Sequence, residues 1–258
     1  MTSPRDDASA RLALVTGTST GIGLALARIL LQRGWAVTGA ARRPAPIDHP
    51  RYRHLSLDLS DVVRAAASLE KDIGPLLSDP RRRRIGLVNN AASADLLTHF
   101  ERIEAAPLLR VYAVNAVMPV WLTALVLRKR PPGAAVRIVN LSSAAAVTAF
   151  PGMAAYCSSK AALRMAGMVL GAELASGGRG DPAAEDVAVL SYEPGLVDTP
   201  MQEAARSQPP DSFPLARMFQ DFAARGALVP PELPAAEIAA FLESERESGF
   251  TERRFGGS

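Results

Sequence analysis

The segment Thr16-Gly17-Thr18-Ser19-Thr20-Gly21-Ile22-Gly23 is the most informative part of this sequence about its fold. It follows a short apolar run at 12–16 without polar alternation, which is typical of a strand buried on both faces. Apolar residues then recur at helical spacing over 22–32. Glycine lets the backbone turn sharply and approach a phosphate, and the unpaired amides that open a helix attract an anion. We therefore predict a strand, a phosphate-binding turn and a helix.

Strand-like and helical segments alternate along the rest of the chain. Strands are expected at 35–40, 52–57, 85–89, 136–141 and 187–192, with a last edge strand within 249–255. Helices are expected at 61–77, 107–130, 153–176 (ended by Gly177 and Gly178) and 235–247. Alternation of this kind predicts a parallel sheet covered on both faces, and right-handed crossovers limit it to the doubly wound type. We expect a three-layer α/β Rossmann fold, a single domain over 1–258 in which 201–234 form a substrate loop or lid with short helices.

Length and composition exclude several classes of protein. The 258 residues are 48% hydrophobic, enough for one substantial core, and the net charge of +3 comes without the basic face of a nucleic-acid-binding module. No apolar run approaches the roughly 18 residues of a membrane span, and residues 1–10 lack the layout of a signal peptide, so we expect a cytoplasmic protein. The one cysteine, Cys157, is a packing residue or a nucleophile. His49, His54 and His99 share no metal-ligand spacing, so no metal is expected.

The glycine spacing of the opening stretch is itself informative. It reads Gly-x-x-x-Gly-x-Gly, whereas the usual dinucleotide fingerprint is Gly-x-Gly-x-x-Gly. With Thr16 before the first glycine, it resembles the cofactor motif of short-chain dehydrogenases/reductases. The resemblance implies that a nicotinamide cofactor is bound by Gly17, Thr18, Ser19, Gly21, Ile22 and Gly23.

The end of the second predicted strand favours NADP(H). An NAD site usually has a carboxylate there to accept a hydrogen bond from the ribose 2′-hydroxyl, but this strand ends Gly39-Ala40-Ala41-Arg42-Arg43. A guanidinium pairs well with a 2′-phosphate because it is planar and always charged. Arg42 is the expected main contact and Arg43 the second; the alternative is that both are simply exposed to solvent.

Tyr156 and Lys160 are four residues apart on a predicted helix, which places them on one face about a turn apart. A nearby lysine cation favours the phenolate and lowers the pKa of a tyrosine, which improves it as an acid–base at neutral pH. Such a pair is common by chance. However, Ser142 and Ser143 directly follow the fifth strand, at the sheet edge where ligands bind. Ser143 precedes Tyr156 by thirteen residues, an order and spacing similar to the family's catalytic Ser-Tyr-Lys; Ser142 is the neighbouring alternative.

The resemblance assigns further residues. Asn115 matches the family's fourth catalytic residue, whose backbone carbonyl holds a water joined to the lysine; without the family it would be a helix-packing residue. Asp58 matches the aspartate that faces the adenine amino group, although it or Ser60 could instead cap the following helix. Asn89-Asn90-Ala91-Ala92 resembles the family's Asn-Asn-Ala-Gly, with Ala92 in place of glycine, and 194–199 resembles the Pro-Gly segment beside the nicotinamide. The remaining residues implied at the cofactor are Leu59, Asn90, Ala91, Pro194, Gly195, Val197 and Thr199.

Together these motifs imply an NADPH-dependent reductase that transfers hydride to a carbonyl. Tyr156 would donate the proton, Ser143 would steady the oxyanion, and Lys160 would lower the tyrosine pKa and hold the nicotinamide ribose. Residues 192–202 look like the corresponding stretch of sepiapterin reductases and bacterial benzil reductases, which implies a diketone or pterin-like substrate. Arg253 stands where our alignment places their substrate-anchoring aspartate, which favours a vicinal diketone or other hydrophobic carbonyl over a pterin.

Three alternatives use the same motifs: a non-catalytic NADP-sensing module, an alcohol dehydrogenase that works oxidatively, and an epimerase or dehydratase of the extended family. The helices expected at 107–130 and 153–176 match those that join subunits in the family, so a homodimer or homotetramer is expected. A small-molecule carbonyl compound is the expected partner, with neither nucleic acid nor membrane.

Overall fold

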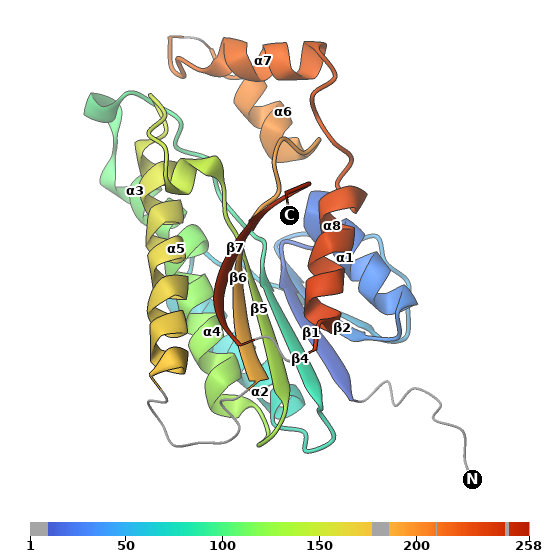
Figure 1. Ribbon diagram of the computed structural model, residues 1–258. Coiled ribbons are helices and arrows are strands. Elements are labelled where there is room, and N and C mark those ends of the chain that lie inside the picture. Colours follow the sequence, from blue (N-terminus) through green and yellow to red (C-terminus); the bar gives the residue numbers. More distant parts are fainter. Residues whose placement is uncertain (1–9, 177–185, 210, 246–247, 258) are drawn as a thin grey trace.

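One parallel sheet runs through the protein, as a computed structural model describes it for residues 10–176, 186–209, 211–245 and 248–257 (Figure 1). Its seven strands are β1 (Arg11–Thr16), β2 (Ala36–Ala41), β3 (Tyr52–Ser56), β4 (Arg84–Asn89), β5 (Ala135–Leu141), β6 (Val187–Glu193) and β7 (Gly249–Arg254). They lie in the order β3-β2-β1-β4-β5-β6-β7, and every neighbouring pair is parallel. The strand order reverses beside β1, so the predicted doubly wound Rossmann fold is confirmed.

Helices cover both faces of the sheet (Figure 1). On one face, α1 (Gly21–Gln32) and α8 (Glu232–Glu243) pack over one core cluster; on the other, α2 (Val62–Leu77), α4 (Met118–Lys129) and α5 (Ala154–Ala175) pack over a second. All seven residues of β5 are buried, whereas four of the six residues of β7 are exposed at the sheet edge. Burial on two faces is why the inner strands read as apolar runs without alternation.

The single helix expected at 107–130 has an internal irregularity. It consists of α3 (Ala105–Tyr112), a π-helical turn η2 (Ala113–Val117) and then α4. By length and composition alone, Ala105–Lys129 is long and apolar enough to cross a membrane, contrary to our expectation that no such run exists. Half of its most apolar 18-residue window is buried within the protein, and a core helix passes the same test. The π turn carries Asn115, and such turns are frequent at functional sites.

The C-terminal third differs in detail from the expected boundaries. Two short helices, α6 (Pro200–Arg206) and α7 (Ala216–Ala224), lie within the predicted substrate loop. Helix α8 begins three residues earlier than expected because Pro231 occupies its N-cap and proline is well tolerated in a first turn. It ends at Glu243; of the four further residues we assigned to it, 246–247 lie outside the described residues, as do Gly177 and Gly178.

Strand β5 contains a buried cation that the apolar pattern did not predict. Arg137 is 0% exposed, and its guanidinium donates to the Ser244 carbonyl oxygen from Nη2 (2.9 Å) and Nε (3.2 Å). It also donates to the backbone oxygen of Asp186 and forms an ion pair with that side chain. Arg84 of β4 donates to the same Ser244 oxygen at 2.6 Å. The two arginines thus tie the chain after α8 to the amino-terminal edge of the sheet.

Candidate active site

The Gly-rich turn lies between β1 and α1 and is locked to the end of β4. Asn90 Nδ2 donates to the backbone oxygens of Thr16 (2.7 Å) and Gly17 (3.1 Å). Gly17 has a φ of +75°, and a Cβ there would lie 2.7 Å from Asn90 Nδ2. A Cβ at Gly23 would lie 2.5 Å from the same nitrogen. Only glycine therefore permits the turn to pack this closely on Asn90.

The start of α1 is suited to a phosphate. Among the described residues, no side chain caps the helix at Thr20, and the first turn of α1 carries no acidic residue. The amides of 20–23 are thus left to an anion that the helix dipole favours. Asn90 and Ala91 each donate their backbone N–H to Thr16 Oγ1 at 3.0 Å, which holds the end of β4 against this turn. The residues present therefore fit a dinucleotide diphosphate.

The residues expected around the adenosine lie where β2 and β3 end. Arg42 and Arg43 are both exposed after β2. Hydrogen bonds from the backbone and hydroxyl of Ser60 (2.9 and 2.8 Å) lower the pKa of Asp58, with a smaller contribution from the charge of Arg42. Neither Asp58 nor Ser60 caps α2: Asp61 does, accepting from the Arg64 amide at 3.2 Å. The alternative in which Asp58 or Ser60 caps this helix is therefore wrong. The neighbouring Leu59, which we expected at the adenosine, has its side chain buried in the core cluster under α2.

Ser143, Tyr156 and Lys160 come together at the end of β5. Lys160 is 2% exposed, and its Nζ donates to the Leu141 backbone oxygen at 2.6 Å. The same nitrogen lies 5.7 Å from the centre of the Tyr156 ring. The Ser143 side chain accepts from the Ala145 amide at 3.2 Å and interacts with the Tyr156 hydroxyl closely enough to lower the pKa of that phenol. Helix α5 and the loop after β5 thus assemble the triad whose sequence order and spacing we noted.

The pKa of Tyr156 is shifted upward, whereas we expected Lys160 to lower it. Burial raises the pKa of Tyr156 to about 12, and the hydrogen bond with Ser143 opposes this only in part. Burial also lowers the pKa of Lys160 to about 8. Lys160 is not among the groups that shift the Tyr156 pKa; its ammonium donates to the Leu141 backbone oxygen instead. The phenol is therefore protonated at neutral pH, which is the state a proton donor requires.

Asn115 is joined to α5 by a buried network. Its Nδ2 donates to the Ser93 backbone oxygen (2.9 Å) and to Ser159 Oγ (3.0 Å), and its Oδ1 accepts from the Ser93 amide (2.7 Å). Ser159 Oγ in turn donates to the backbone oxygen of Tyr156 at 2.9 Å. The π turn thereby connects to the backbone of the candidate acid. Sequence reasoning missed Ser159, although it lies one position before Lys160 on the inner side of α5.

The segment after β6 borders the Gly-rich turn. A Cβ at Gly21 would lie 3.1 Å from Thr199 Cγ2, so these two parts of the chain are in contact range. Gly195 has a φ of +73°, and Val197 forms an isolated parallel bridge with Val229. Thr199 caps α6 by accepting from the Gln202 amide at 3.4 Å. The structure therefore places 194–199 between the Gly-rich turn and the substrate loop.

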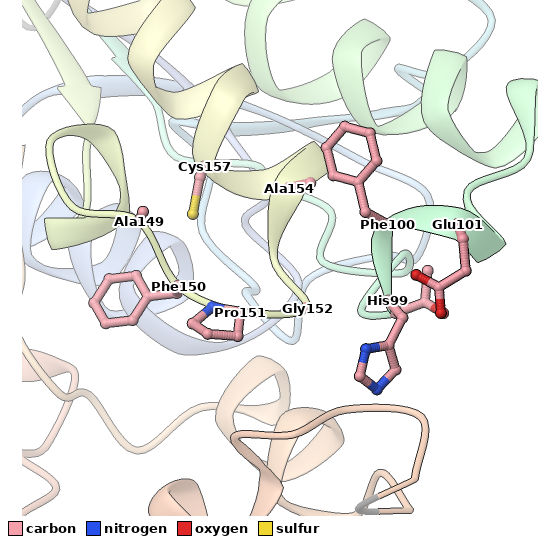
Figure 2. Close-up of a pocket in the computed structure, with 10 residues that line it drawn as sticks. His99, Phe100, Glu101, Ala149, Phe150, Pro151, Gly152, Ala154 and Cys157 are labelled. Atoms are coloured by element: carbon pink, nitrogen blue, oxygen red, sulfur yellow. The ribbon is translucent and has the colours of Figure 1, made fainter.

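A cavity of about 400 Å³ lies beside the first turn of α5 (Figure 2). Figure 2 shows His99, Phe100 and Glu101 on one side of it and Phe150, Pro151 and the Cys157 sulfur on the other. Cys157 lines the cavity, whereas Tyr156 does not; the two side chains share an apolar cluster beside it. Beyond it, Ala205, Phe213 and Ala216 of the substrate loop form an apolar cluster that packs with Tyr156 and Cys157. In the part of the chain that is described, no cluster of His, Cys, Asp and Glu could hold a metal.

A second cavity, of about 310 Å³, lies next to Ser142 and Ser143. Ser142 and Ser143 line it together with charged residues, which are Arg164, Glu193, Glu252, Arg253 and Arg254. Arg253 lies in β7 opposite Tyr192 of β6, and its guanidinium is 5.7 Å from the centre of the Phe241 ring. The Arg253 guanidinium therefore lies in the same cavity as the two serines.

The fold and the groups gathered at the carboxyl edge of its sheet define a Rossmann-type oxidoreductase. The sequence model of the family described as short chain dehydrogenase matches residues 11–210. The chain belongs to this family of short-chain dehydrogenases/reductases, whose members use nicotinamide cofactors and typically act on small molecules.

Two of the similar proteins are named for the carbonyl compounds that they reduce. Benzil reductase ((S)-benzoin forming) of Bacillus subtilis (strain 168) is 29% identical over 92% of this chain and 96% of its own length. Sepiapterin reductase of Bos taurus is 30% identical over 92% of each chain. Among solved structures, a short-chain dehydrogenase/reductase of Saccharomyces cerevisiae matches with a TM-score of 0.76 and 25% identity over 95% of this chain and 96% of its own. These similarities confirm the resemblance seen in the motifs and support carbonyl reduction in general.

Proposed function

We propose that this chain is an NADPH-dependent reductase that converts a carbonyl group to an alcohol, with Tyr156 as the proton donor. The observation that carries the proposal is the convergence of Ser143, Tyr156 and Lys160 at the sheet edge that also bears the Gly-rich turn. A hydroxyl, a phenol and an ammonium around one point suit a carbonyl oxygen that gains negative charge as it is reduced.

The cofactor would lie along the carboxyl ends of the strands. Its diphosphate would meet the Gly-rich turn at Gly17, Thr18, Ser19, Gly21, Ile22 and Gly23, and its adenosine would meet Arg42, Arg43, Asp58 and Leu59. Its nicotinamide end would meet Asn90, Ala91, Pro194, Gly195, Val197, Thr199, Tyr156 and Lys160. When bound, it supplies the hydride for the carbonyl carbon.

The protein's own groups would manage the proton. The Ser143 hydroxyl would donate a hydrogen bond to the substrate oxygen and hold it beside the Tyr156 phenol. Tyr156 is protonated at neutral pH because burial raises its pKa to about 12, so it can deliver a proton as negative charge develops. Lys160, whose pKa is lowered to about 8, can then stabilise the phenolate and return a proton to it. The hydrogen bond between Asn115 and Ser159 would hold the π turn against α5. The Asn115 backbone carbonyl would accept a hydrogen bond from a water that is also bonded to Lys160.

The substrate side favours a hydrophobic carbonyl compound. The cavity beside the first turn of α5 is lined by Phe100, Phe150 and Pro151, which suit an aromatic or aliphatic arm, and Phe150 packs on the same apolar cluster as Tyr156. Residues 201–234 would act as the lid over it, since Phe213 and Ala216 pack in the cluster that includes Tyr156. Arg253 cannot accept hydrogen bonds from a pterin amine, and the carboxylates of Glu193 and Glu252 in the same cavity are already paired with Arg254 and Arg164. A vicinal diketone such as benzil therefore fits better than a pterin.

A spectrophotometric screen of NADPH consumption tests this function. Benzil, sepiapterin, simple aryl ketones and quinones are the substrates, with NADH in parallel and with the product alcohols plus NADP⁺ to follow the reverse direction. We expect benzil to be reduced faster than sepiapterin with NADPH. Consumption of neither coenzyme with any of these carbonyl compounds, by folded protein, would contradict the proposal.

Replacement of Arg42 tests the cofactor preference. In Arg42→Ala the KM for NADPH is expected to rise about tenfold, because one charge-assisted contact to the 2′-phosphate is lost, while the KM for NADH changes little. Arg64→Ala, at an exposed arginine on α2, is the matched control. Equal KM values for NADPH in the variant and the wild type would show that Arg42 does not contact the phosphate.

We also propose that the protein is a cytoplasmic homodimer or homotetramer. The π turn and helices α4 and α5 expose apolar side chains that a monomer would leave in water, namely Val117, Val120, Met165, Met168 and Val169. Light scattering coupled to size exclusion measures the number of subunits directly.

A further inference from the structure

Thr18 of the Gly-rich turn has a side chain that does not reach solvent. The residue is 0% exposed, so its hydroxyl faces the protein beneath the turn. There, Thr18 Oγ1 lies 3.1 Å from the Tyr52 hydroxyl. Tyr52 belongs to β3, the outermost strand on this side of the sheet, and β2 lies between β3 and β1. A hydrogen bond therefore spans from the edge strand to the turn, across an intervening strand.

Gly39 of β2 makes this contact possible. A Cβ at Gly39 would lie 2.5 Å from Thr18 Oγ1 and would also collide with the Tyr52 hydroxyl. Gly39 pairs with Val15 of β1 on one side and with His54 of β3 on the other. The missing side chain leaves open the space in which the threonine and tyrosine hydroxyls meet.

The Tyr52 ring is itself held in place. It packs against the core cluster beneath α1, and its hydroxyl is 3.3 Å from Nδ1 of His54. The Tyr52 amide donates to the His49 backbone oxygen at 2.9 Å. Burial raises the pKa of Tyr52, so the hydroxyl keeps its proton and can bridge Thr18 and His54. The turn thus has an anchor on β3 in addition to the bond from the Gly17 amide to the Ala40 oxygen (2.8 Å) on β2.

We propose that Tyr52 is a positioning residue for the dinucleotide cofactor, acting through Thr18. The proposal rests on the proposed function, in which the Gly-rich turn binds the cofactor diphosphate. Backbone amides bind an anion best when they are held in the bound geometry beforehand, because less ordering is then required on binding. By fixing Thr18 from below, Tyr52 preorganises the amides that follow it.

The test removes one oxygen atom. Tyr52→Phe keeps the packed ring but loses the hydroxyl, and the Kd for NADPH, measured by nucleotide fluorescence, is expected to rise about fivefold, as for loss of one buried hydrogen bond. The KM for NADPH rises in parallel, while kcat at saturating NADPH stays within about twofold because the triad is untouched. Tyr112→Phe is the matched control, since the Tyr112 hydroxyl makes no hydrogen bond with the described residues.

A double-mutant cycle shows whether the effect passes through Thr18. Thr18→Val deletes the partner hydroxyl, and because each variant removes the same bond, the pair together is expected to weaken NADPH binding no more than either alone. Thr18→Ser retains the hydroxyl and is expected to weaken NADPH binding less than Thr18→Val does. Amide hydrogen exchange over residues 17–24, without cofactor, is expected to be faster in Tyr52→Phe.

The outcomes separate the two proposals. Wild-type protein that binds neither NADPH nor NADH would overturn the proposed function. Wild-type protein that binds NADPH while Tyr52→Phe binds it equally well would overturn only the role of Tyr52. Additive effects of Tyr52→Phe and Thr18→Val would also overturn it, because they would show that the two hydroxyls act independently.

Discussion

Tyr156→Phe is expected to lower kcat by about 10³-fold, within the usual contribution of a positioned acid, while the Kd for NADPH changes less than about twofold. The phenylalanine ring fills the same space on α5, but no proton stands ready for the substrate oxygen. The cofactor contacts attributed to the Gly-rich turn and to Arg42 are left intact.

Two measurements on one preparation decide this prediction. Single-turnover reduction of benzil reports the chemical step, and NADPH fluorescence titration reports cofactor binding. A variant with wild-type turnover would remove Tyr156 from the mechanism. Loss of NADPH binding together with turnover would show that Tyr156 mainly holds the cofactor and is not established as the proton donor.

Arg137→Met is expected to lower the free energy of unfolding by about 3 kcal/mol, as when one partner of a buried polar network is removed. Methionine has a similar reach, but it donates no hydrogen bond. The buried oxygen of Ser244 would lose its bonds from Arg137, and the backbone oxygen of Asp186 would lose its donor.

Urea unfolding followed by circular dichroism measures this change, with Arg64→Met on the exposed face of α2 as the control. Arg137 lies at the amino-terminal end of β5, whereas Ser143 follows its carboxyl end, so kcat of the folded variant is expected to stay within about twofold. An unchanged midpoint of unfolding would mean that the network contributes nothing net to stability.

The fold class could be predicted because its signals are local. The apolar strand at 12–16, the glycines at 17, 21 and 23 and the alternation of strands with helices all reflect constraints within short segments. Boundaries were less predictable. Helix α8 starts earlier than its apolar pattern because prolines open it, and the π turn at Ala113–Val117 left no mark in the helical periodicity.

For the candidate site, the residues could be predicted from the sequence but their electrostatics could not. The family motifs identified Ser143, Tyr156 and Lys160, and the structure brings these three together. The direction of the Tyr156 pKa shift was not predictable, because the spacing of two residues on a helix says nothing about how far water is excluded from them. The capping role assigned to Asp58 or Ser60 was wrong for a related reason, since the helix starts only after Asp61.

The parallel α/β architecture, the glycine-rich turn and the order of the candidate catalytic side chains can be read from the sequence, because each depends on residues that are close along the chain. The burial of Arg137 in β5, the link from Ser159 to Asn115 and the contact of Tyr52 with Thr18 over Gly39 depend on how distant segments pack. Those contacts join segments about 34 to 107 residues apart, and hydrogen bonds between such distant groups depend on burial and sheet register rather than on local propensity.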